Sequence, residues 1–272
     1  MTMGPAGGEM RVIRACGHRA HVRLDGAAAG PSWVFVNALG TDLRVWDPLL
    51  PHLPGKRLVR YDTRGHGLSE LTPGPYTMAG LADDLAAVLD ALGSTSTVVV
   101  GLSIGGMIAL ALAARRPELV RGLVLMDTAA RIGTAEMWRE RAATVERDGV
   151  GALAEATMTR WFPEAFRREH EDDVFLWRTM LERTPAAGYA ACCAALGEAE
   201  LADAAARLTV PSLCLVGEHD GSTPPDVVRG LAASIPGAEF ELIPDAGHLP
   251  HVVRPDDVAA CLARFEQERG LS

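Results

Sequence analysis

The chain has 272 residues, of which 48% are hydrophobic and 22% charged, and its 35 acidic and 26 basic side chains give a formal charge of −9. This composition predicts a folded protein with a sizeable core and argues against a disordered chain or a minimal scaffold. The negative balance and the lack of a long Lys/Arg run argue against nucleic acid and anionic membranes as partners, because phosphate binding depends on clustered cations.

The termini and the cysteines indicate a cytoplasmic location. The start of the chain, Met1 to Glu9, is Gly-rich and lacks the charged and apolar parts of a secretory signal. No apolar run approaches the roughly 18 residues that a membrane span needs. The five cysteines form no CxxC pair and are typical of buried, reduced thiols.

Short apolar runs alternate with longer helical patterns along most of the chain, which predicts an α/β fold with a mostly parallel sheet and helices on both faces. An antiparallel pair, about Arg11 to Ala15 and Ala20 to Asp25, is expected before the first parallel strand. The runs expected to form buried parallel strands are Trp33 to Asn37, Arg57 to Asp62, Thr97 to Leu102, Gly122 to Met126, Ser212 to Val216 and Glu239 to Ile243.

Two apolar stripes at helical spacing predict helices that pack on this sheet. The first has Thr77 as its expected cap and places Asp83, Asp84 and Asp90 on the solvent face. The second follows the acidic pair Asp256 and Asp257, which suits a helix start. The stripes consist of Leu81, Leu85, Val88, Leu89 and Leu92, and of Val258, Cys261, Leu262 and Phe265.

The alternation breaks between residues 130 and 208, where apolar residues keep helical spacing and no strand-like run occurs. We therefore expect a core made of residues 1–129 and 209–272, with an inserted helical cap at 130–208. The charged stretch Arg167 to Asp173 in this cap is expected to be a solvated face.

The segment Thr97 to Arg116 joins a β-branched run to an Ala/Leu-rich helix through GLSIG, a G-x-S-x-G motif in the strand-turn-helix context that it requires. Such a turn strains the backbone at Ser103, so Gly101 and Gly105 are needed where a Cβ would collide with a neighbouring element. The turn exposes the Ser103 hydroxyl, and the helix directs its free N–H groups to the same place. Ser103 is therefore the predicted nucleophile.

A serine nucleophile needs a general base and a carboxylate that orients it, in the chain order Ser, acid, His. His248 follows the last predicted strand in DAGHLPH and is the predicted base. Asp220 in LVGEHDGSTPP is the predicted acid; Asp127, at the end of an earlier strand, and Glu218 remain alternatives. The His248 to His251 spacing resembles a metal pair, but Pro250 and the absence of a helix argue against one.

Two backbone amides are expected to stabilise an oxyanion. The residue after the nucleophile, Ile104, supplies one, and Leu39 in VFVNALG, after an early strand, supplies the other. Asn37 is expected to hold this loop at the substrate site, and Gly40 permits its tight path.

The motifs GLSIGG, YDTRGHG (Tyr61 to Gly67) and DAGHLPH together resemble the α/β-hydrolase superfamily over nearly the whole chain. Five further segments resemble 3-oxoadipate enol-lactonases more narrowly. These are NALGTDLRVWD (Asn37 to Asp47), RYDTRGHGLSE (Arg60 to Glu70), GPYTMAGLADDL (Gly74 to Leu85), DTAARIGTAEMW (Asp127 to Trp138) and GYAACCAAL (Gly188 to Leu196). The sequence departs from the family in having Ala38 where Ser is usual, and in HLPHVV after the last strand.

This resemblance implies the α/β-hydrolase fold, a triad of Ser103, Asp220 and His248, and a substrate that enters between core and cap. The implied reaction opens a small carboxylated enol-lactone without a cofactor or a metal. Such a substrate requires a local cation, for which Arg131 is the candidate. Trp138 is a further candidate contact, although Trp138 and Trp161 both suit the core of the cap.

Two alternatives stay open at this point. The same triad serves a carboxylesterase or a cofactor-free perhydrolase acting on neutral esters. A non-hydrolytic member of the fold could instead receive a ligand or guide a cyclisation, although the intact triad disfavours this. The expected partner is thus a small lactone or ester. A homo-oligomer is compatible with the sequence, which does not specify one.

Overall fold

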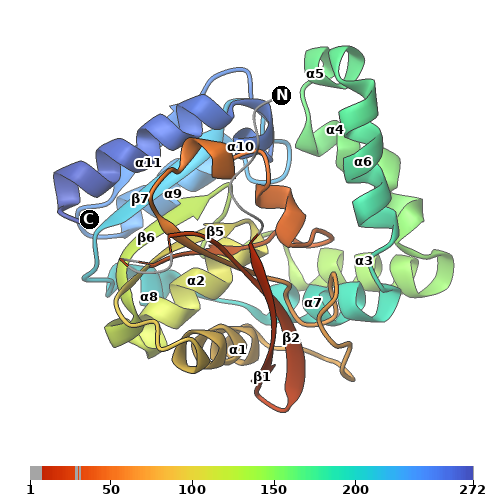
Figure 1. Ribbon diagram of the computed structural model, residues 1–272. Helices are drawn as coiled ribbons and strands as arrows, with labels where there is room; N and C mark the ends of the chain where they lie inside the picture. The colour runs from red at the N-terminus through yellow and green to blue at the C-terminus, as the bar shows by residue number, and fades with distance from the viewer. Residues whose placement is uncertain (1–7, 28–29, 31, 272) are drawn as a thin grey trace.

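The computed structural model describes residues 8–27, 30 and 32–271. Within these residues an eight-stranded sheet has the order β1-β2-β4-β3-β5-β6-β7-β8 (Figure 1). Neighbouring strands from β4 to β8 are parallel, and β2 pairs antiparallel with both β1 and β4. The strands are β1 (Glu9–Ala15), β2 (His18–Gly26), β3 (Ser32–Val36), β4 (Arg57–Tyr61), β5 (Thr97–Leu102), β6 (Val120–Met126), β7 (Ser212–Gly217) and β8 (Glu239–Ile243).

The predicted strands and the N-terminal antiparallel pair are confirmed, with one correction. β3, β5 and β7 are buried at every position, but β8 is buried only at Ile243. β8 is the edge strand and pairs with β7 alone, so solvent reaches its outer side. An apolar run therefore indicated the strand correctly but not its place in the sheet.

The strand order reverses between β3 and β5, and this reversal locates the site. The chain leaves β3 for β4 on one side and then returns to place β5 on the other side of β3. The loops at the carboxyl ends of β3 and β5 diverge there and leave a crevice, which is where open α/β sheets bind their ligands. The loop after β3 begins at Asn37, and the turn after β5 contains Ser103.

Helices cover both faces of the sheet, as predicted. Figure 1 shows α11 above the sheet and α1, α2 and α8 below it. The Thr77 hydroxyl caps α1 by accepting a hydrogen bond from the Gly80 N–H at 3.0 Å. These helices and the short 3-10 turns of the core are α1 (Met78–Ala91), α2 (Ile104–Arg115), α9 (Pro225–Ser234), α10 (Pro250–Val253), α11 (Pro255–Arg269), η1 (Leu43–Trp46), η2 (Leu50–His52) and η3 (Pro117–Leu119).

The predicted solvent face of α1 is wrong at one residue. Asp84 is buried, and its carboxylate binds the Arg64 guanidinium and lies near His18. The turn after β4 brings Arg64 over α1, and this long-range ion pair is invisible in the helical periodicity. Asp83 and Asp90 are on the exposed side as expected.

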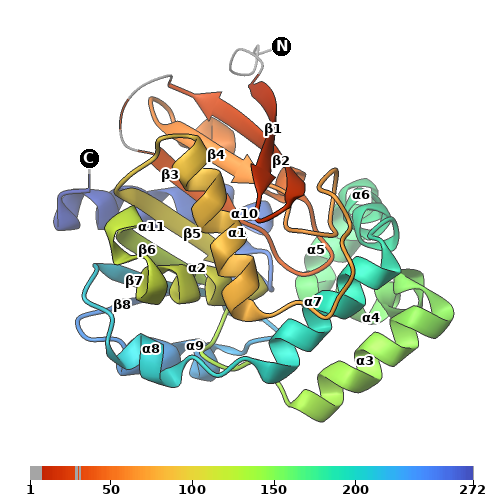
Figure 2. The same cartoon turned by 90° about the horizontal axis from the view of Figure 1, so that it is seen from below.

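The segment between β6 and β7 is helical throughout, as its spacing predicts, and most of it stands to one side of the sheet (Figure 2). Its last helix, α8, packs against α2 and α9. The boundaries of the cap at residues 130 and 208 stay predictions. The elements of this segment are α3 (Ala135–Asp148), η4 (Val150–Leu153), α4 (Ala154–Trp161), α5 (Glu164–Glu169), α6 (Glu171–Glu182), α7 (Ala186–Glu198) and α8 (Ala202–Ala206).

The prediction that Met1 to Glu9 form no secretory signal concerns mostly residues 1–7, which lie outside the described residues. Among the helices that the structure describes, none has the length and apolar character needed to cross a bilayer.

Candidate active site

Ser103 lies at the sharp turn between β5 and α2, in a backbone conformation that few L-residues adopt. Its φ is 58° and its ψ is −121°. Its N–H donates to the Met126 carbonyl at 2.9 Å, and its carbonyl accepts from the Thr128 hydroxyl at 2.6 Å. Contacts from β6 and the residues that follow it therefore hold the strained turn in place.

The glycines on either side of Ser103 are required by close approach, as predicted. A Cβ on Gly101 would lie 2.3 Å from the Gly105 carbonyl oxygen, and a Cβ on Gly105 would lie 2.2 Å from the Val36 carbonyl oxygen. Both distances fall far below van der Waals contact. The start of α2 can therefore press against β3 and β5 only because these positions are glycine.

The structure brings His248 and Asp220 together, although 28 residues separate them in the chain. His248 Nδ1 lies 2.8 Å from Asp220 Oδ2, and both side chains are buried. An ionised carboxylate can only accept hydrogen bonds, so Nδ1 carries the proton and Nε2 is left to face the cavity. Asp220 also accepts hydrogen bonds from the Thr223 hydroxyl and the Ser222 N–H.

Asp127, the alternative acid, lies beside this pair but is in a different state. Burial would raise the pKa of Asp220, but the nearby His248 and the hydrogen bonds that Asp220 accepts outweigh burial and lower it. Burial and the adjacent Asp220 instead raise the pKa of Asp127 well above its ordinary value. Asp127 Oδ1 accepts only the Gly217 N–H, and among the described residues Oδ2 has no hydrogen-bond partner. The environment thus favours an ionised Asp220 and a protonated Asp127.

The two amides expected at the oxyanion both lie beside Ser103. Ile104 begins α2, and Leu39 lines the same cavity as Ser103. Within the described part of the chain, neither N–H donates to another protein atom. The tight path after Leu39 requires Gly40, whose φ is +79° and whose N–H donates to His66 Nε2 at 3.2 Å.

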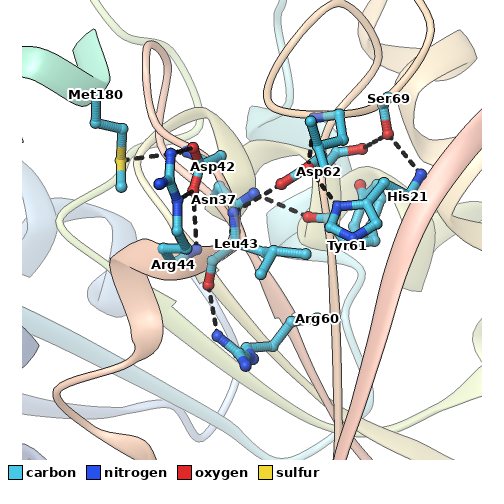
Figure 3. Close-up of polar contacts among 11 residues, drawn as sticks. His21, Asn37, Asp42, Leu43, Arg44, Arg60, Tyr61, Asp62, Ser69 and Met180 are labelled. Atoms are coloured by element: carbon cyan, nitrogen blue, oxygen red, sulfur yellow. Dashed lines mark hydrogen bonds and ion pairs between the residues drawn. The ribbon is translucent and has the colours of Figure 1, made fainter. Parts of the chain in front are cut away.

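Asn37 does not reach the cavity, which corrects its prediction as a substrate contact. Its side-chain N–H donates to the Tyr61 carbonyl at 2.8 Å (Figure 3), and its oxygen accepts from Trp46 Nε1. Both polar groups of this fully buried amide are therefore occupied by the protein. Asn37 ties the loop after β3 to β4 and η1, which is the loop-holding part of its predicted role.

A cavity of about 210 Å³ contains the predicted nucleophile and base together. Ser103 and His248 lie on its core side, and Trp138 and Trp161 line it from α3 and α4. The prediction that Trp138 lies at the site is therefore consistent with the structure. Trp161, expected mainly as a core residue, lines the cavity as well.

Two guanidinium groups that the sequence analysis did not single out also line this cavity. Arg141 Nε donates to the Tyr189 hydroxyl at 2.9 Å, and Arg160 Nη2 donates to Thr157 Oγ1 at 3.1 Å. No carboxylate among the described residues forms an ion pair with either. Burial and the neighbouring Arg141 lower the pKa of Arg160, as expected for a cation without a counter-ion.

Arg131, the cation predicted for this role, lies elsewhere. Its side chain is 52% exposed and pairs with Glu200 at 3.1 Å, outside the cavity. The helical spacing offered a signal for Arg141, which follows Trp138 by three residues and so shares a helix face with it. Arg160, which directly precedes Trp161, had no such signal.

The matched family model agrees with this architecture. A model described as alpha/beta hydrolase fold matches residues 31–255. The chain therefore belongs to the alpha/beta hydrolase fold family, and it is a hydrolase.

Proteins similar to this chain include two enol-lactonases and an esterase. The chain is 34% identical to 3-oxoadipate enol-lactonase 1 of Acinetobacter baylyi, over 92% of this chain and 93% of that protein. The crystal structure of the enol-lactonase from Burkholderia xenovorans LB400 has a TM-score of 0.92 and 36% identity, covering 94% of this chain and all of that one. A malate-bound thermophilic esterase from Thermogutta terrifontis has a TM-score of 0.89 and 31% identity, covering 96% and 99% of the two chains.

Proposed function

We propose that this protein is a serine hydrolase that opens a small carboxylated enol-lactone, converting 3-oxoadipate enol-lactone to 3-oxoadipate. The observation that carries the proposal is the composition of one cavity, where Ser103 and the Asp220-bound His248 lie beside two unpaired guanidiniums. The similarity to two enol-lactonases supports the same substrate class.

In the first half-reaction, Ser103 Oγ attacks the lactone carbonyl carbon while His248 Nε2 takes the hydroxyl proton. The Leu39 and Ile104 amides donate to the developing oxyanion, and Asp220 stabilises the imidazolium. Collapse of the tetrahedral intermediate breaks the bond between the acyl carbon and the ring oxygen. His248 returns its proton to the departing enol, which leaves an acyl group on Ser103.

In the second half-reaction, His248 removes a proton from water, and the resulting hydroxide attacks the acyl carbon. The bond from the acyl carbon to Ser103 Oγ then breaks, and His248 gives its proton to Oγ. The freed enol tautomerises to a ketone, and this step makes ring closure unfavourable. All of these proton transfers use one imidazole, so the Nδ1 bond to Asp220 must hold the ring in one orientation throughout.

The substrate carboxylate is assigned to Arg141 and Arg160. A guanidinium binds a carboxylate through charge-assisted and frequently bidentate hydrogen bonds, which are strong where water is excluded. Both side chains reach the cavity from the helical segment after β6, whereas the nucleophile and base come from loops of the sheet. The lactone would therefore be held by its carboxylate on one side while its ring carbonyl faces Ser103.

A second candidate is a carboxylesterase or perhydrolase acting on neutral esters, which the similarity to a thermophilic esterase favours. The same three residues would perform the chemistry, but the two arginines would then have no ligand to bind. The two candidates therefore differ in whether Arg141 and Arg160 contribute to substrate affinity.

The test follows the loss of enol-lactone absorbance in wild type, Ser103→Ala and Arg160→Gln. Ser103→Ala should reduce turnover by a factor on the order of 10⁵ or more. Arg160→Gln should raise KM for the lactone at least about tenfold, which corresponds to one lost charge-assisted contact, with little change in kcat. KM for the neutral ester p-nitrophenyl acetate should be unchanged in Arg160→Gln.

Arg131→Gln is the matched control, because it removes an arginine of the same segment that lies outside the cavity. Its KM for the lactone should equal that of wild type. Ser103-dependent hydrolysis of neutral esters, without any opening of the lactone, would assign the protein to the esterase alternative.

A further inference from the structure

A second cavity, of about 300 Å³, lies apart from the Ser103 site and shares no lining residue with it. Its walls come from β2, from the segment entering η1, from the turn after β4 and from the end of α6. Figure 3 shows the polar contacts around it, with Met180 of α6 facing Asp42 and with His21 beside Asp62. The proposed reaction uses none of these residues.

Two buried nitrogen atoms at this cavity lack hydrogen-bond partners. His21 Nδ1 lies 2.8 Å from Asp62 Oδ2, which leaves His21 Nε2 on the opposite side of the ring. Among the described residues, neither His21 Nε2 nor Arg23 Nε is hydrogen-bonded, although both atoms are buried. The His21 side chain is more than nine-tenths buried. Arg23 Nε has Asp25 Oδ1 at 3.4 Å, so His21 Nε2 is the more poorly satisfied of the two. An unpaired buried polar group is costly, and a ligand in the cavity that reached His21 Nε2 would relieve that cost.

The two carboxylates at the cavity are already used by protein donors. Asp62 accepts the Leu43 N–H at 2.7 Å, the Leu68 N–H at 2.8 Å and a hydrogen bond from His21. Asp42 binds the Arg44 guanidinium at 2.6 Å, as Figure 3 also shows. These carboxylates therefore offer little to a cationic ligand.

The remaining charge at the cavity is positive. Arg183 forms no ion pair with any described residue. Arg23 Nε forms an ion pair with Asp25 Oδ1 at 3.4 Å, while Arg60 binds the other oxygen of that carboxylate, so only the terminal nitrogens of Arg23 remain for a ligand. Both guanidiniums line the cavity, so its free hydrogen-bonding capacity consists mainly of donors that carry charge.

The rest of the lining is apolar and partly open. Met10 and Leu68 are 63% and 72% exposed, and Leu43 and Met180 form buried parts of the wall. Exposed side chains of this size beside guanidiniums with free donors indicate a ligand with an apolar body and an anionic head.

We propose that this cavity binds a small organic carboxylate with a short apolar chain. The carboxylate would lie against His21, Arg23 and Arg183, with the chain over Leu68 and Met10. This site is separate from the proposed hydrolase site and does not depend on the substrate assigned there.

An occupant would join the segment entering η1 to the end of α6. These segments already touch, because the Asp42 N–H contacts Met180 Sδ at 3.5 Å and the Thr184 hydroxyl donates to the Gly40 carbonyl at 3.3 Å. Gly40 directly follows Leu39, a predicted oxyanion donor. The ligand would therefore stabilise the contact between the helical segment and the loop that carries this amide.

The test is calorimetric titration of the full chain with hexanoate after Ser103 has been blocked with a fluorophosphonate. Blocking fills the space in front of Ser103, and the variants described below assign the remaining binding to the second cavity. We expect hexanoate to bind with a Kd on the order of 1 mM, which is typical of so small a ligand. Hexanol and inorganic phosphate, which each lack one half of the predicted ligand, should bind at least about tenfold more weakly.

Arg183→Gln and Leu68→Glu are exposed substitutions that should leave the fold intact. Each should weaken hexanoate binding at least about fivefold, the first by removing a cation and the second by adding a like charge. Arg131→Gln, an exposed arginine outside both cavities, should bind as wild type does. Failure of the blocked protein to bind hexanoate, equal binding of hexanol, or unchanged affinity in both variants would overturn the proposal.

Discussion

The Ser103 cavity and the cavity beside His21 each contain a buried imidazole whose Nδ1 lies 2.8 Å from an aspartate. Their surroundings differ. His248 shares its cavity with a serine held in a strained turn, whereas no serine is among the lining residues beside His21. The two Asp-His pairs therefore differ in which groups share the cavity with the imidazole.

The two aspartates also differ in what else they bind. Besides its histidine, Asp220 binds the hydroxyl of Thr223 and the N–H of Ser222, both within its own loop. Asp62 binds the N–H groups of Leu43 and Leu68, which belong to separate segments. Asp220 thus orients an imidazole, and Asp62 joins two segments of the fold.

The largest expected effect is a loss of turnover on changing Asp220, the aspartate paired with His248. Asp220→Asn should lower kcat on the order of 10³- to 10⁴-fold, because the amide no longer stabilises the imidazolium or enforces its tautomer. The melting temperature should change little, since Asn keeps the volume and one acceptor. Turnover of the enol-lactone at neutral pH measures the effect, and a near-normal rate would remove Asp220 from the role of orienting acid.

The next effect should appear in stability. Asp62→Asn should reduce the free energy of unfolding by about 2–4 kcal/mol, because the Leu43 and Leu68 N–H groups and the His21 ring lose a charged acceptor. The kcat of the folded fraction should stay within about tenfold of wild type, a change of 1.4 kcal/mol or less in the barrier. Urea unfolding and turnover on the same samples separate the two effects. A greater loss of turnover than in Asp220→Asn would contradict the comparison.

A third buried histidine, His251, has a backbone carbonyl instead of an aspartate as its hydrogen-bond partner. His251 Nε2 lies 3.0 Å from the Val45 carbonyl oxygen, and its ring lies 4.4 Å from that of Trp46. Burial lowers the pKa of His251 from 6.5 to about 3. The folded state therefore resists protonation, while the unfolded state takes up a proton below its pKa of 6.5.

It follows that His251 destabilises the fold as pH falls through the window from 6.5 toward 3, and has no such effect above 6.5. By about pH 5 this single group should cost about 2 kcal/mol relative to pH 8. Urea unfolding of wild type and His251→Gln at both pH values tests this. The variant should lose less stability on acidification, and identical pH dependence in the two proteins would show that His251 is not responsible.

The smallest expected effect is at Asp127, the alternative to Asp220 as the orienting acid. Asp127→Asn should change kcat less than about tenfold, because Asn reproduces a protonated carboxyl and can still accept the Gly217 N–H. Measuring Asp127→Asn beside Asp220→Asn compares a carboxyl that favours the protonated form with an adjacent carboxyl that favours the ionised form. A loss as large as that of Asp220→Asn would assign the orienting role to Asp127.

The features predicted well from sequence are those whose local structure is set by neighbours in the chain. The strand, turn and helix around Ser103 are contiguous, so the strain and the flanking glycines could be inferred locally. The loops after β7 and β8 hold few titratable residues, which kept the choice of acid and base small. Asp127 remained an alternative because its protonation depends on its distance from Asp220, which the sequence does not show.

The residues that line the cavity were predicted less well. Arg131 was chosen for its place near the start of the helical segment, but its side chain points to solvent and Glu200. Asn37 has both polar groups engaged within the core. Arg141 and Arg160 line the cavity instead, and their convergence depends on how α3 and α4 pack over the sheet.

By itself, the sequence determined the α/β class, the strand positions and the sharp turn at Ser103, because periodicity and glycine requirements act over a few neighbouring residues. Only the tertiary structure decided which carboxyl meets His248, which cations face Ser103, and that a second Asp-His pair lies beside an unrelated cavity. Those outcomes depend on contacts between segments that are distant in the chain. Charge pairing and desolvation act through space, and no local pattern encodes them.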